Sequence, residues 1–302
     1  MKRYVVTGAA GFIGSHLAHA LVARGHDVLG IDSFTDYYDT ALKEENASGL
    51  DIARLDLARD DLDLKGYDGV FHLAGQPGVR SFGDVFELYL TRNVLASQRL
   101  FEAAARDGVR VVFSSSSSIY GEAEAYPTSE DTPPRPISPY GITKLAAEQL
   151  ARATAASFGL DVVVLRYFNA YGPRQRPDMA FTRIALALAE DRLFDLFGDA
   201  SRSFTYVGDV VDATIEAMVR GEGIYNVGGG TEVSMREVIA AFERLAGREL
   251  DVRDHPAAAG DQRRTKADTT RIRRALGWEP TTSFEDGLRA QWEWAAARVA
   301  AR

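Results

Sequence analysis

Apolar segments alternate with amphipathic ones through roughly the first 170 residues. Continuous hydrophobic runs predict six strands, at residues 4–7, 27–32, 52–56, 69–73, 110–114 and 162–166. Apolar residues recur every three or four positions at 12–23, 93–106 and 140–158, and this spacing predicts helices. Strands separated by helices predict βαβ units and therefore a parallel sheet. Several strands are apolar on both faces, so we expect helices to cover both sides of the sheet.

The pattern becomes less regular after residue 170. A stretch rich in Pro, Glu and Thr at 120–139 predicts a surface loop, a second loop is expected at 256–260, and a helix is expected from about Phe181. The predicted main domain is 1–168, with elements of about 204–230 returning to it. The remaining residues, 169–203 and 231–302, are predicted to form a smaller, interleaved substrate lobe.

Composition removes several classes of function. The net charge of −8, with no basic stretch to offset it, argues against a nucleic-acid partner. The chain has no cysteine, which excludes disulfides, thiol catalysis and thiolate metal sites, and its five histidines are scattered, so no metal site is predicted. No signal peptide and no long apolar run are evident, so we expect a cytoplasmic protein without a membrane partner.

A glycine-rich turn joins the first predicted strand to the first predicted helix. Its residues Gly8, Gly11, Phe12, Ile13 and Gly14 form a Gly-x-x-Gly-x-x-Gly pattern. Glycines at such a turn let the backbone approach a pyrophosphate, which the helix N-terminus binds through free N–H groups. The strand before and the helix after this turn predict a Rossmann-type, doubly wound α/β fold that binds a dinucleotide.

The ends of the next strands supply further candidates for cofactor binding. Asp32 ends the second strand, where a carboxylate binds ribose hydroxyls and repels a 2′-phosphate, so NAD is favoured over NADP. An ordinary turn residue is the alternative for Asp32. Asp56 and Leu57 follow the third strand and are expected to flank the adenine. Small residues at the end of the fourth strand leave space for a cofactor close to the backbone. The candidates there are Leu73, Ala74 and Gly75.

Tyr140 and Lys144 form the candidate catalytic pair. Ser138 and Pro139 are typical of a helix start, so Tyr140 and Lys144 should lie one turn apart on one face. An ammonium beside a phenol favours the phenolate, which can then act as a base near neutral pH. A hydroxyl partner for the substrate is expected among the serines at 114–118. The alternative is a solvated tyrosine and lysine on a helix surface.

These motifs together resemble an extended short-chain dehydrogenase/reductase, and most closely its sugar-nucleotide epimerases and dehydratases. The resemblance extends from Tyr4 to the Leu-Gly-Trp-Glu-Pro segment at 276–280 and includes the motifs at 166–173 and 202–209. It implies that Ser116 is the catalytic hydroxyl, that Tyr140, Lys144 and Tyr167 contact NAD, and that Asn169 contacts the substrate. It also implies a homodimer that pairs helices at about 85–106 and 140–158.

Two serines distinguish the reaction within this group. Similar dehydratases have Asp-Glu directly after the catalytic hydroxyl, and similar UDP-glucuronate decarboxylases have Glu at the second of these positions. Here the two positions are Ser117 and Ser118, which we expect to contact the substrate. Without an adjacent carboxylic acid, elimination of water lacks its acid and base. The expectation is therefore epimerisation by oxidation and re-reduction.

The segment at 172–181 resembles the corresponding segment of UDP-glucuronate 4-epimerases. The resemblance implies that Arg176 binds the sugar carboxylate, because a guanidinium can hold a carboxylate by two hydrogen bonds. The alternatives are an arginine on a mobile loop or one that pairs with Asp178. Arg202 matches an arginine that binds the pyrophosphate, and Asp261 belongs to the last substrate motif. Relatives often have an arginine just before that motif, where this chain has alanines, so Arg263 or Arg264 is a possible substitute.

The resulting expectation is NAD-dependent 4-epimerisation of a UDP-sugar, UDP-glucuronate to UDP-galacturonate, through a 4-keto intermediate. Tyr140 would remove the proton of the C4 hydroxyl, and Ser116 would hydrogen-bond the same oxygen. Three alternatives remain: a 4-epimerase of UDP-glucose or UDP-N-acetylglucosamine, a UDP-glucuronate decarboxylase, and a non-catalytic NAD-binding regulatory protein. The last of these is expected to lose part of the set formed by Ser116, Tyr140 and Lys144.

Overall fold

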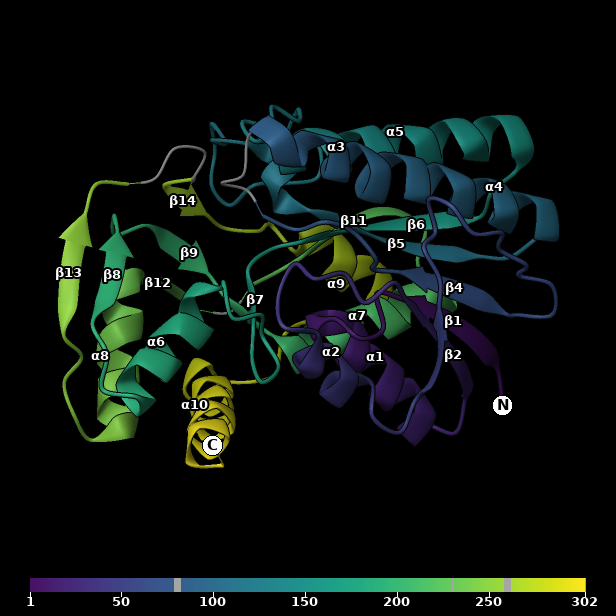
Figure 1. Cartoon of the computed structure of the whole chain (residues 1–302). Coiled ribbons are helices and arrows are strands. Elements are labelled where there is room, and N and C mark those ends of the chain that lie inside the picture. Colours follow the sequence, from purple (N-terminus) through teal and green to yellow (C-terminus); the bar gives the residue numbers. More distant parts are fainter. Residues whose placement is uncertain (79–82, 230, 258–261, 302) are drawn as a thin grey trace.

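A seven-stranded parallel sheet forms the centre of the protein in its computed structural model, which describes residues 1–78, 83–229, 231–257 and 262–301 (Figure 1). The strand order is β11-β6-β5-β4-β1-β2-β3. The bounds are β1 (Arg3–Thr7), β2 (Asp27–Asp32), β3 (Asp51–Arg54), β4 (Gly69–His72), β5 (Val111–Ser116), β6 (Val162–Tyr167) and β11 (Gly223–Val227). This topology confirms the predicted doubly wound α/β fold.

The six predicted strands are present, with two shifts in their ends that affect the site. β5 continues two residues beyond its predicted end, because Ser115 and Ser116 pair with Arg166 and Tyr167 of β6. β3 ends at Arg54, two residues early. The predicted strand residue Asp56 lies instead in a turn, where its carboxylate accepts a hydrogen bond from the backbone N–H of Ala58 at 3.0 Å.

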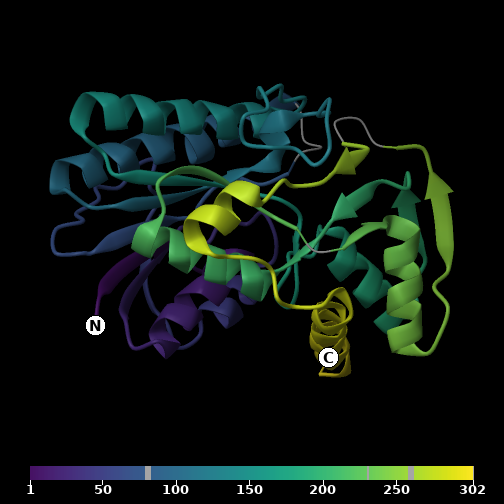
Figure 2. The ribbon, with the colours of Figure 1, turned by 180° about the vertical axis from the view of Figure 1, so that it is seen from behind.

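Helices cover both faces of the sheet (Figures 1 and 2). Alternate strand residues supply two separate cores: Val6 and Val112 pack with α1 and α7, whereas Val5 and Val111 pack with α4 and α5. Side chains alternate between the faces of a strand, so strands buried on both sides are apolar throughout. The helices of these two layers are α1 (Phe12–Ala23), α2 (Thr40–Ala47), α3 (Phe86–Tyr89), α4 (Ala96–Asp107), α5 (Pro139–Phe158) and α7 (Val207–Arg220).

The predicted helix at 93–106 begins differently from the prediction. A π-helical segment at Leu90–Leu95 connects α3 to α4, and Asn93 lies inside it. The buried Asn93 amide donates to the Gln76 carbonyl and to Thr143 Oγ1, both at 3.1 Å, and its Oδ1 accepts from the Gln76 N–H at 2.7 Å. The segment therefore ties the loop after β4 to α5.

A smaller lobe lies beside the carboxyl ends of the strands (Figure 1). Its core includes Phe181, Phe242 and Leu288 from three helices. Those helices are α6 (Ala180–Ala189), α8 (Met235–Ala246) and α10 (Phe284–Ala300). Its short strands are β7 (Ala170–Tyr171) with β10 (Thr205–Tyr206), β8 (Phe194–Phe197) with β13 (Val252–His255), and β9 (Ser201–Ser203) with β12 (Glu232–Ser234) and β14 (Arg264–Thr265).

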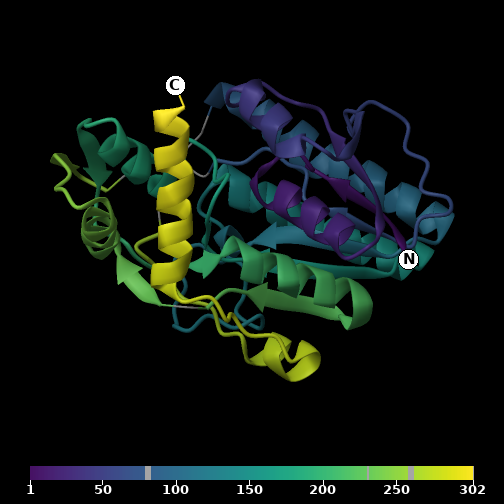
Figure 3. The same ribbon diagram turned by 90° about the horizontal axis from the view of Figure 1, so that it is seen from below.

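Two C-terminal helices connect the lobe to the sheet. Helix α10 runs along the lobe (Figure 3), and Arg298 in its last turn forms an ion pair with Glu45 of α2 at 2.5 Å. Helix α9 (Thr270–Leu276) packs against β11 and α7, where Ile272 and Leu276 join the core of the sheet. The predicted lobe of 231–302 thus includes a segment that packs on the sheet, and the domain boundaries stay a prediction. Within the described part of the chain, no helix combines the length and apolar character needed to cross a membrane.

Candidate active site

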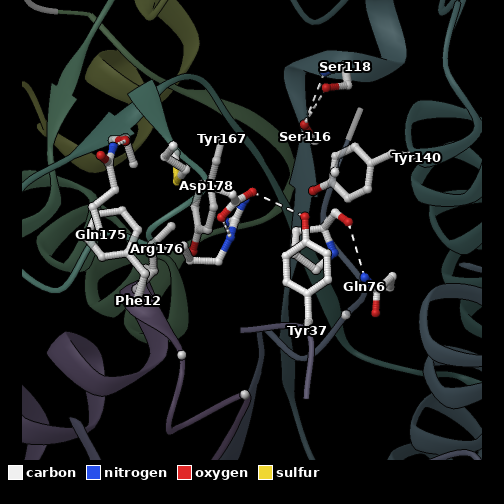
Figure 4. Close-up of a pocket in the computed structure, with 18 of the residues that line it drawn as sticks. Phe12, Tyr37, Gln76, Ser116, Ser118, Tyr140, Tyr167, Gln175, Arg176 and Asp178 are labelled. Carbon is white, nitrogen blue, oxygen red and sulfur yellow. Dashed lines mark hydrogen bonds and ion pairs between the residues drawn. The ribbon is translucent and has the colours of Figure 1, made fainter. Parts of the chain in front are cut away.

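A cavity of about 690 Å³, the central cavity, lies where the carboxyl ends of the sheet strands face the small lobe (Figure 4). In open α/β sheets this edge is where ligands bind. Its walls contain these predicted site residues: Gly8, Gly11, Phe12, Ile13, Gly14, Asp32, Asp56, Leu57, Leu73, Ala74, Gly75, Ser116, Ser117, Ser118, Tyr140, Lys144, Tyr167, Asn169, Arg176 and Arg202. The two substitutes offered for the phosphate-site arginine, Arg263 and Arg264, do not line it, and Arg264 pairs with Glu232. The predicted substrate residue Asp261 lies outside the described residues.

The turn between β1 and α1 has room for backbone only. Gly8 has a φ of +69°, and a Cβ at this position would lie 2.9 Å from the backbone nitrogen of Ala74. A Cβ at Gly14 would lie 2.1 Å from the Gly8 carbonyl oxygen. No side chain caps the N-terminus of α1, and its first turn has no acidic residue. Helix N–H groups left without a cap, beside a tight glycine turn, fit the pyrophosphate of a dinucleotide.

Asp32 lies beside this turn with its carboxylate anchored by the backbone. It accepts hydrogen bonds from the Ala10 N–H at 3.1 Å and the Phe34 N–H at 2.8 Å. The second contact is that of a turn residue, which was the alternative for Asp32, yet the carboxylate also lines the central cavity. A fixed negative charge at this place suits ribose hydroxyls and disfavours a 2′-phosphate.

A buried polar chain, which the sequence analysis did not identify, supports the end of β4. Thr7 Oγ1 accepts from the N–H groups of Leu73 and Ala74 at 3.2 and 3.1 Å. It also lies 2.8 Å from His72 Nδ1, while His72 Nε2 lies 3.0 Å from Ser97 Oγ. Ser97 donates to the Asn93 carbonyl, so His72 carries its proton on Nε2 and accepts from Thr7. Burial lowers the pKa of His72 to about 3, and the charge of Lys144 contributes.

The predicted hydroxyls follow the end of β5. Ser116 has an extended backbone, and a 3₁₀ turn at Ser117–Tyr120 comes next. Ser116 Oγ accepts from the Ser118 N–H at 3.1 Å and donates to Ser118 Oγ at 3.1 Å (Figure 4). All three serines therefore face the central cavity from one compact turn.

Helix α5 begins as predicted and carries Tyr140 and Lys144 into the cavity. Ser138 caps it by accepting from the Gly141 N–H at 3.1 Å, and Pro139 is in its first turn. Lys144 Nζ donates to the Ser114 carbonyl at 2.9 Å. Burial lowers the pKa of Lys144 to about 8, and the carboxylate of Glu148 acts in the opposite direction.

The phenol of Tyr140 is subject to opposing influences. Burial raises its pKa, whereas a hydrogen bond with Ser116 and the positive charge of Arg176 lower it. The helical spacing predicts Lys144 as the cation beside the phenol, whereas in this structure the charge that lowers the pKa of Tyr140 is that of Arg176. Ser116 and Arg176 therefore both favour the deprotonated form of Tyr140.

Arg176 pairs with Asp178, which was one of the alternatives raised for it. Its Nε and Nη2 donate to Asp178 Oδ1 and Oδ2 at 3.0 and 3.1 Å. The Tyr37 hydroxyl donates to Asp178 Oδ2 at 3.2 Å (Figure 4). The guanidinium nevertheless lines the central cavity beside the predicted catalytic residues.

The remaining predicted residues contact the lobe or the sheet through their polar atoms. Asn169 Nδ2 donates to Thr265 Oγ1 at 2.7 Å, and Arg202 Nη2 donates to the Gln262 carbonyl at 3.2 Å. The Tyr167 hydroxyl lies 2.7 Å from Thr214 Oγ1 of α7. Only the rest of the Tyr167 side chain is thus left to contact a cofactor.

The central cavity has a charge balance opposite to that of the whole chain. Among the described residues its walls carry six lysine and arginine side chains and four aspartates, whereas the chain has a net charge of −8. Such a cavity suits an anionic ligand. The charged and aromatic wall residues without a site role predicted from the sequence are Tyr37, Tyr38, Lys43, Arg92, Phe168, Asp178, Phe181, Arg183, Phe194, Asp195, Phe197 and Phe204.

The glycine turn, the acid at the end of β2 and the Ser–Tyr–Lys set define an NAD-binding protein of the Rossmann type with the groups for hydride chemistry. Residues 4–228 match the model of the NAD dependent epimerase/dehydratase family, so the chain belongs to this family. The predicted membership in the sugar-nucleotide epimerase group, and the prediction of an enzyme, are thereby confirmed.

Named relatives cover almost the whole chain. It is 40% identical over 303 residues to the "Uncharacterized UDP-glucose epimerase YtcB" of Bacillus subtilis, with 95% of each chain covered. It is 34% identical over 316 residues to a UDP-glucuronate 4-epimerase of Thermodesulfobacterium geofontis, covering 99% of this chain and 98% of the relative.

The crystal structure of UDP-glucuronic acid 4-epimerase from Bacillus cereus, in complex with UDP-glucuronic acid and NAD, has a TM-score of 0.94. It is 37% identical, with 98% of this chain and 99% of that chain covered. The names of these relatives agree on epimerisation and differ in the sugar, and they give no support to the decarboxylase alternative.

Proposed function

We propose that this protein catalyses the NAD-dependent 4-epimerisation of UDP-glucuronate to UDP-galacturonate. The observation that carries the proposal is Arg176, a guanidinium in the same cavity as Tyr140 and close enough to lower its pKa. A carboxylate on C5 of a sugar is adjacent to the C4 carbon that reacts, so its cation should lie near the catalytic phenol. The solved relative that binds UDP-glucuronic acid adds support.

The chain's own residues can move the proton of the sugar hydroxyl. Tyr140 Oη, as phenolate, accepts the proton of the C4 hydroxyl, and Ser116 Oγ hydrogen-bonds the same oxygen. The hydrogen bond with Ser116 and the charge of Arg176 oppose the rise in the pKa of Tyr140 that burial causes. The Lys144 ammonium, anchored on the Ser114 carbonyl, supplies a fixed positive charge at the base of the site.

The proposed cofactor contacts follow the glycine turn and the strand ends. Gly8, Gly11 and Gly14 let the turn pack tightly, so that the uncapped N–H groups at the start of α1 bind the pyrophosphate, and Asp32 accepts hydrogen bonds from ribose hydroxyls. Bound NAD supplies the hydride acceptor and donor for C4. Ser117 and Ser118 contact the sugar, and Arg202 contacts the diphosphate at the end of the cavity lined by the lobe.

Arg176 also has a protective part in this proposal. Once C4 is a ketone, the C5 carboxylate is β to it, and loss of carbon dioxide would leave an enolate that takes up a proton. That loss requires the breaking bond to stand perpendicular to the carbonyl plane. A guanidinium that holds the carboxylate by two hydrogen bonds keeps the C5–C6 bond away from this orientation and so disfavours the loss.

The decisive experiment compares three substrates. The purified protein is incubated with UDP-glucuronate, UDP-glucose and UDP-N-acetylglucosamine at equal concentrations, and the products are followed by proton NMR of the anomeric region. We expect UDP-galacturonate from the first and much slower conversion of the others. Conversion of a neutral sugar alone would contradict the proposal.

Replacement of Arg176 tests its role directly. For Arg176→Ala we expect kcat/KM for UDP-glucuronate to fall about 100-fold, because a charged bidentate contact is worth roughly 2–3 kcal/mol. The fraction of decarboxylated product should rise. Arg174→Ala is the matched control, since Arg174 belongs to the same loop and is not among the residues that line the central cavity. An unchanged rate and product for Arg176→Ala would remove the assigned role.

One observation favours a second candidate, a 4-epimerase of UDP-glucose or UDP-N-acetylglucosamine. Asp178 already neutralises Arg176, and a neutral sugar makes no demand on that cation. A relative named as a UDP-glucose epimerase supports the same candidate. The substrate comparison above separates the two. The regulatory-protein alternative has no observation in its favour, because Ser116, Tyr140 and Lys144 all line one cavity.

We further propose that the protein is a homodimer. α3, the π-helical segment and α5 pack side by side and expose several apolar side chains, namely Phe86, Leu88, Leu90, Leu95 and Ile142. Exposed apolar groups gathered on neighbouring helices favour association. Light scattering should give the mass of two chains, and Ile142→Asp should give the mass of one. A monomeric wild-type protein would contradict the proposal.

A further inference from the structure

Arg176 is the last member of a short hydrogen-bonded chain, the Tyr37–Asp178–Arg176 chain. Asp178 accepts from Nε and Nη2 of Arg176 on one side and from the Tyr37 hydroxyl on the other. All three side chains line the central cavity, and Figure 4 shows them together. Neither Tyr37 nor Asp178 belongs to the catalytic set assigned above.

The backbone of the loop that carries Arg176 is anchored without the Asp178 side chain. The Gly172 N–H donates to Gln291 Oε1 at 2.8 Å, and His16 Nε2 lies 2.8 Å from the Pro173 carbonyl. The Met179 N–H donates to the Arg176 carbonyl at 3.1 Å. Loss of the Asp178 carboxylate would therefore change the direction of the guanidinium while leaving the path of the loop.

The pairing leaves a defined edge of the guanidinium for a ligand. Asp178 binds the edge formed by Nε and Nη2. Arginine has five N–H donors in a planar fork, so the edge formed by Nη1 and the second hydrogen of Nη2 can bind another carboxylate by two hydrogen bonds. Because the guanidinium is planar, fixing one edge also fixes where the other edge points.

Tyr37 connects this arrangement to the nucleotide side of the cavity. It lies in the loop after β2, five residues beyond Asp32. Burial, together with the charge of Asp178, raises the pKa of Tyr37 to about 12. The hydroxyl therefore stays protonated at physiological pH and remains a donor to Asp178.

We propose that Asp178 is a positioning residue that aims Arg176 at the carboxylate of the sugar, and that Tyr37 holds Asp178 in place. This inference rests on the proposed function, because it assigns Arg176 to a uronate. Removal of the Asp178 charge has two opposing effects: it leaves a net positive site that attracts anions, and it frees a long side chain that must be ordered again on binding. We expect the loss of orientation to outweigh the gain in charge, because Arg176 loses two charged hydrogen bonds and its side chain then has many rotamers.

The test measures binding to the NAD-loaded protein by calorimetry. Tyr140→Phe, which does not interconvert the two uronates, and the double variants that add Asp178→Asn or Tyr37→Phe to it are titrated with UDP-glucuronate, UDP-galacturonate, UDP-glucose and UDP. For Asp178→Asn we expect the Kd of both uronates to rise about tenfold, and for Tyr37→Phe about threefold, as expected when a charged contact loses its orientation. The Kd of UDP-glucose and of UDP should change less than about twofold.

Controls separate positioning from a general structural effect. Asp212→Asn removes an aspartate from a surface ion pair with Arg24 and should leave all four Kd values unchanged. Melting temperatures and NAD content are measured for every variant. A rise in the Kd of all four ligands for Asp178→Asn would overturn the proposal. Tighter binding of the uronates by this variant would also overturn it, because Asp178 would then compete with the substrate carboxylate for Arg176. Turnover by wild type reports on the proposed function alone, and the ratio of uronate to neutral Kd reports on positioning alone.

Discussion

At the scale of single residues, the acidity of Tyr140 is the property on which the proposed chemistry depends. Burial makes the phenolate unfavourable, and Ser116 and Arg176 partly compensate. The helix that carries Tyr140 also carries Lys144, whose ammonium is fixed to the Ser114 carbonyl. A general base has to be deprotonated to act, so these groups adjust how readily Tyr140 takes a proton from a sugar hydroxyl.

Tyr140→Phe removes the hydroxyl and keeps the ring. We expect kcat for the epimerised UDP-sugar to fall about 1000-fold, which is within the range for loss of a general base, while NAD content stays at the wild-type level. Steady-state rates and cofactor content after purification test this. Tyr225→Phe is the matched control, because Tyr225 is a buried tyrosine of β11 that does not line the central cavity. Undiminished turnover by Tyr140→Phe would contradict the assignment of Tyr140 as the general base.

Some of these residues carried a signal in the sequence and others did not. Tyr140 and Lys144 are one helical turn apart, and the glycines occur between a strand and a helix, so their spacing identified them. Asp178 was noticed only as a possible partner of Arg176. Tyr37 contacts Asp178 across 141 positions of the chain, and no local spacing reports such a contact. His72 is a similar case, because its partners Thr7 and Ser97 come from other elements.

At the scale of elements, α10 supports the loop that carries Arg176. Gln291 is fully buried on α10, where its Oε1 accepts from the Gly172 N–H at 2.8 Å. Its Nε2 donates to Gln175 Oε1 at 3.0 Å and lies 3.2 Å from Thr182 Oγ1. One amide thereby joins the loop, the start of α6 and the last long helix.

Gln291→Met keeps the length of the side chain and removes its hydrogen bonds. The Gly172 N–H then loses its acceptor, so we expect a loss of about 1–3 kcal/mol in the free energy of unfolding. The KM for the UDP-sugar should rise, whereas NAD content should stay unchanged, because Gln291 does not line the central cavity and its hydrogen-bond partners are not predicted cofactor residues. Urea unfolding and steady-state kinetics measure these effects. Gln149→Met, on the exposed surface of α5, is the control.

Six strands of the sheet were predictable because each contains a short apolar run, and α1, α4 and α5 were predictable because each has an apolar face. The seventh strand, β11, was anticipated only as part of the segment 204–230 that returns to the main domain. The ends were less predictable, since β5 extends through two serines only because β6 supplies pairing partners. The strands of the lobe were not predictable individually. β9 has three residues and pairs with β12 and β14, which come from distant parts of the chain, so local pattern does not define them.

At the scale of the whole molecule, the main domain contains one fully buried histidine, His72 on β4, and one half-buried histidine, His16 on α1. Burial lowers the pKa of His72 to about 3 and that of His16 to about 4, from an ordinary value of 6.5. Because these pKa values are lower in the folded state, the unfolded chain binds the protons first as the solution is acidified. The stability that the neutral rings provide is thus present above pH 6.5 and lost as the pH falls below it.

We therefore expect the free energy of unfolding to decrease between pH 6.5 and 5 by about 1.4 kcal/mol per pH unit for each of these histidines. His72→Gln should reduce this pH dependence. Ser97→Ala is the control, because it removes a hydrogen-bond partner of His72 but no titrating group. It should lower the free energy of unfolding by the same amount at pH 6.5 and at pH 5. Urea unfolding at several pH values between 5 and 7 gives the slopes. An unchanged slope in His72→Gln would contradict the expectation.

The late position of β11 has a consequence for synthesis of the protein. The outer edge of β6 has no strand beside it until residues 223–227 have left the ribosome, and α9, which covers β11, is made about 40 residues later. A nascent chain that ends after the predicted main domain, at residue 168, therefore exposes an unpaired strand edge, a common starting point for aggregation. The sheet of the main domain can therefore be completed only while the last third of the chain is being synthesised.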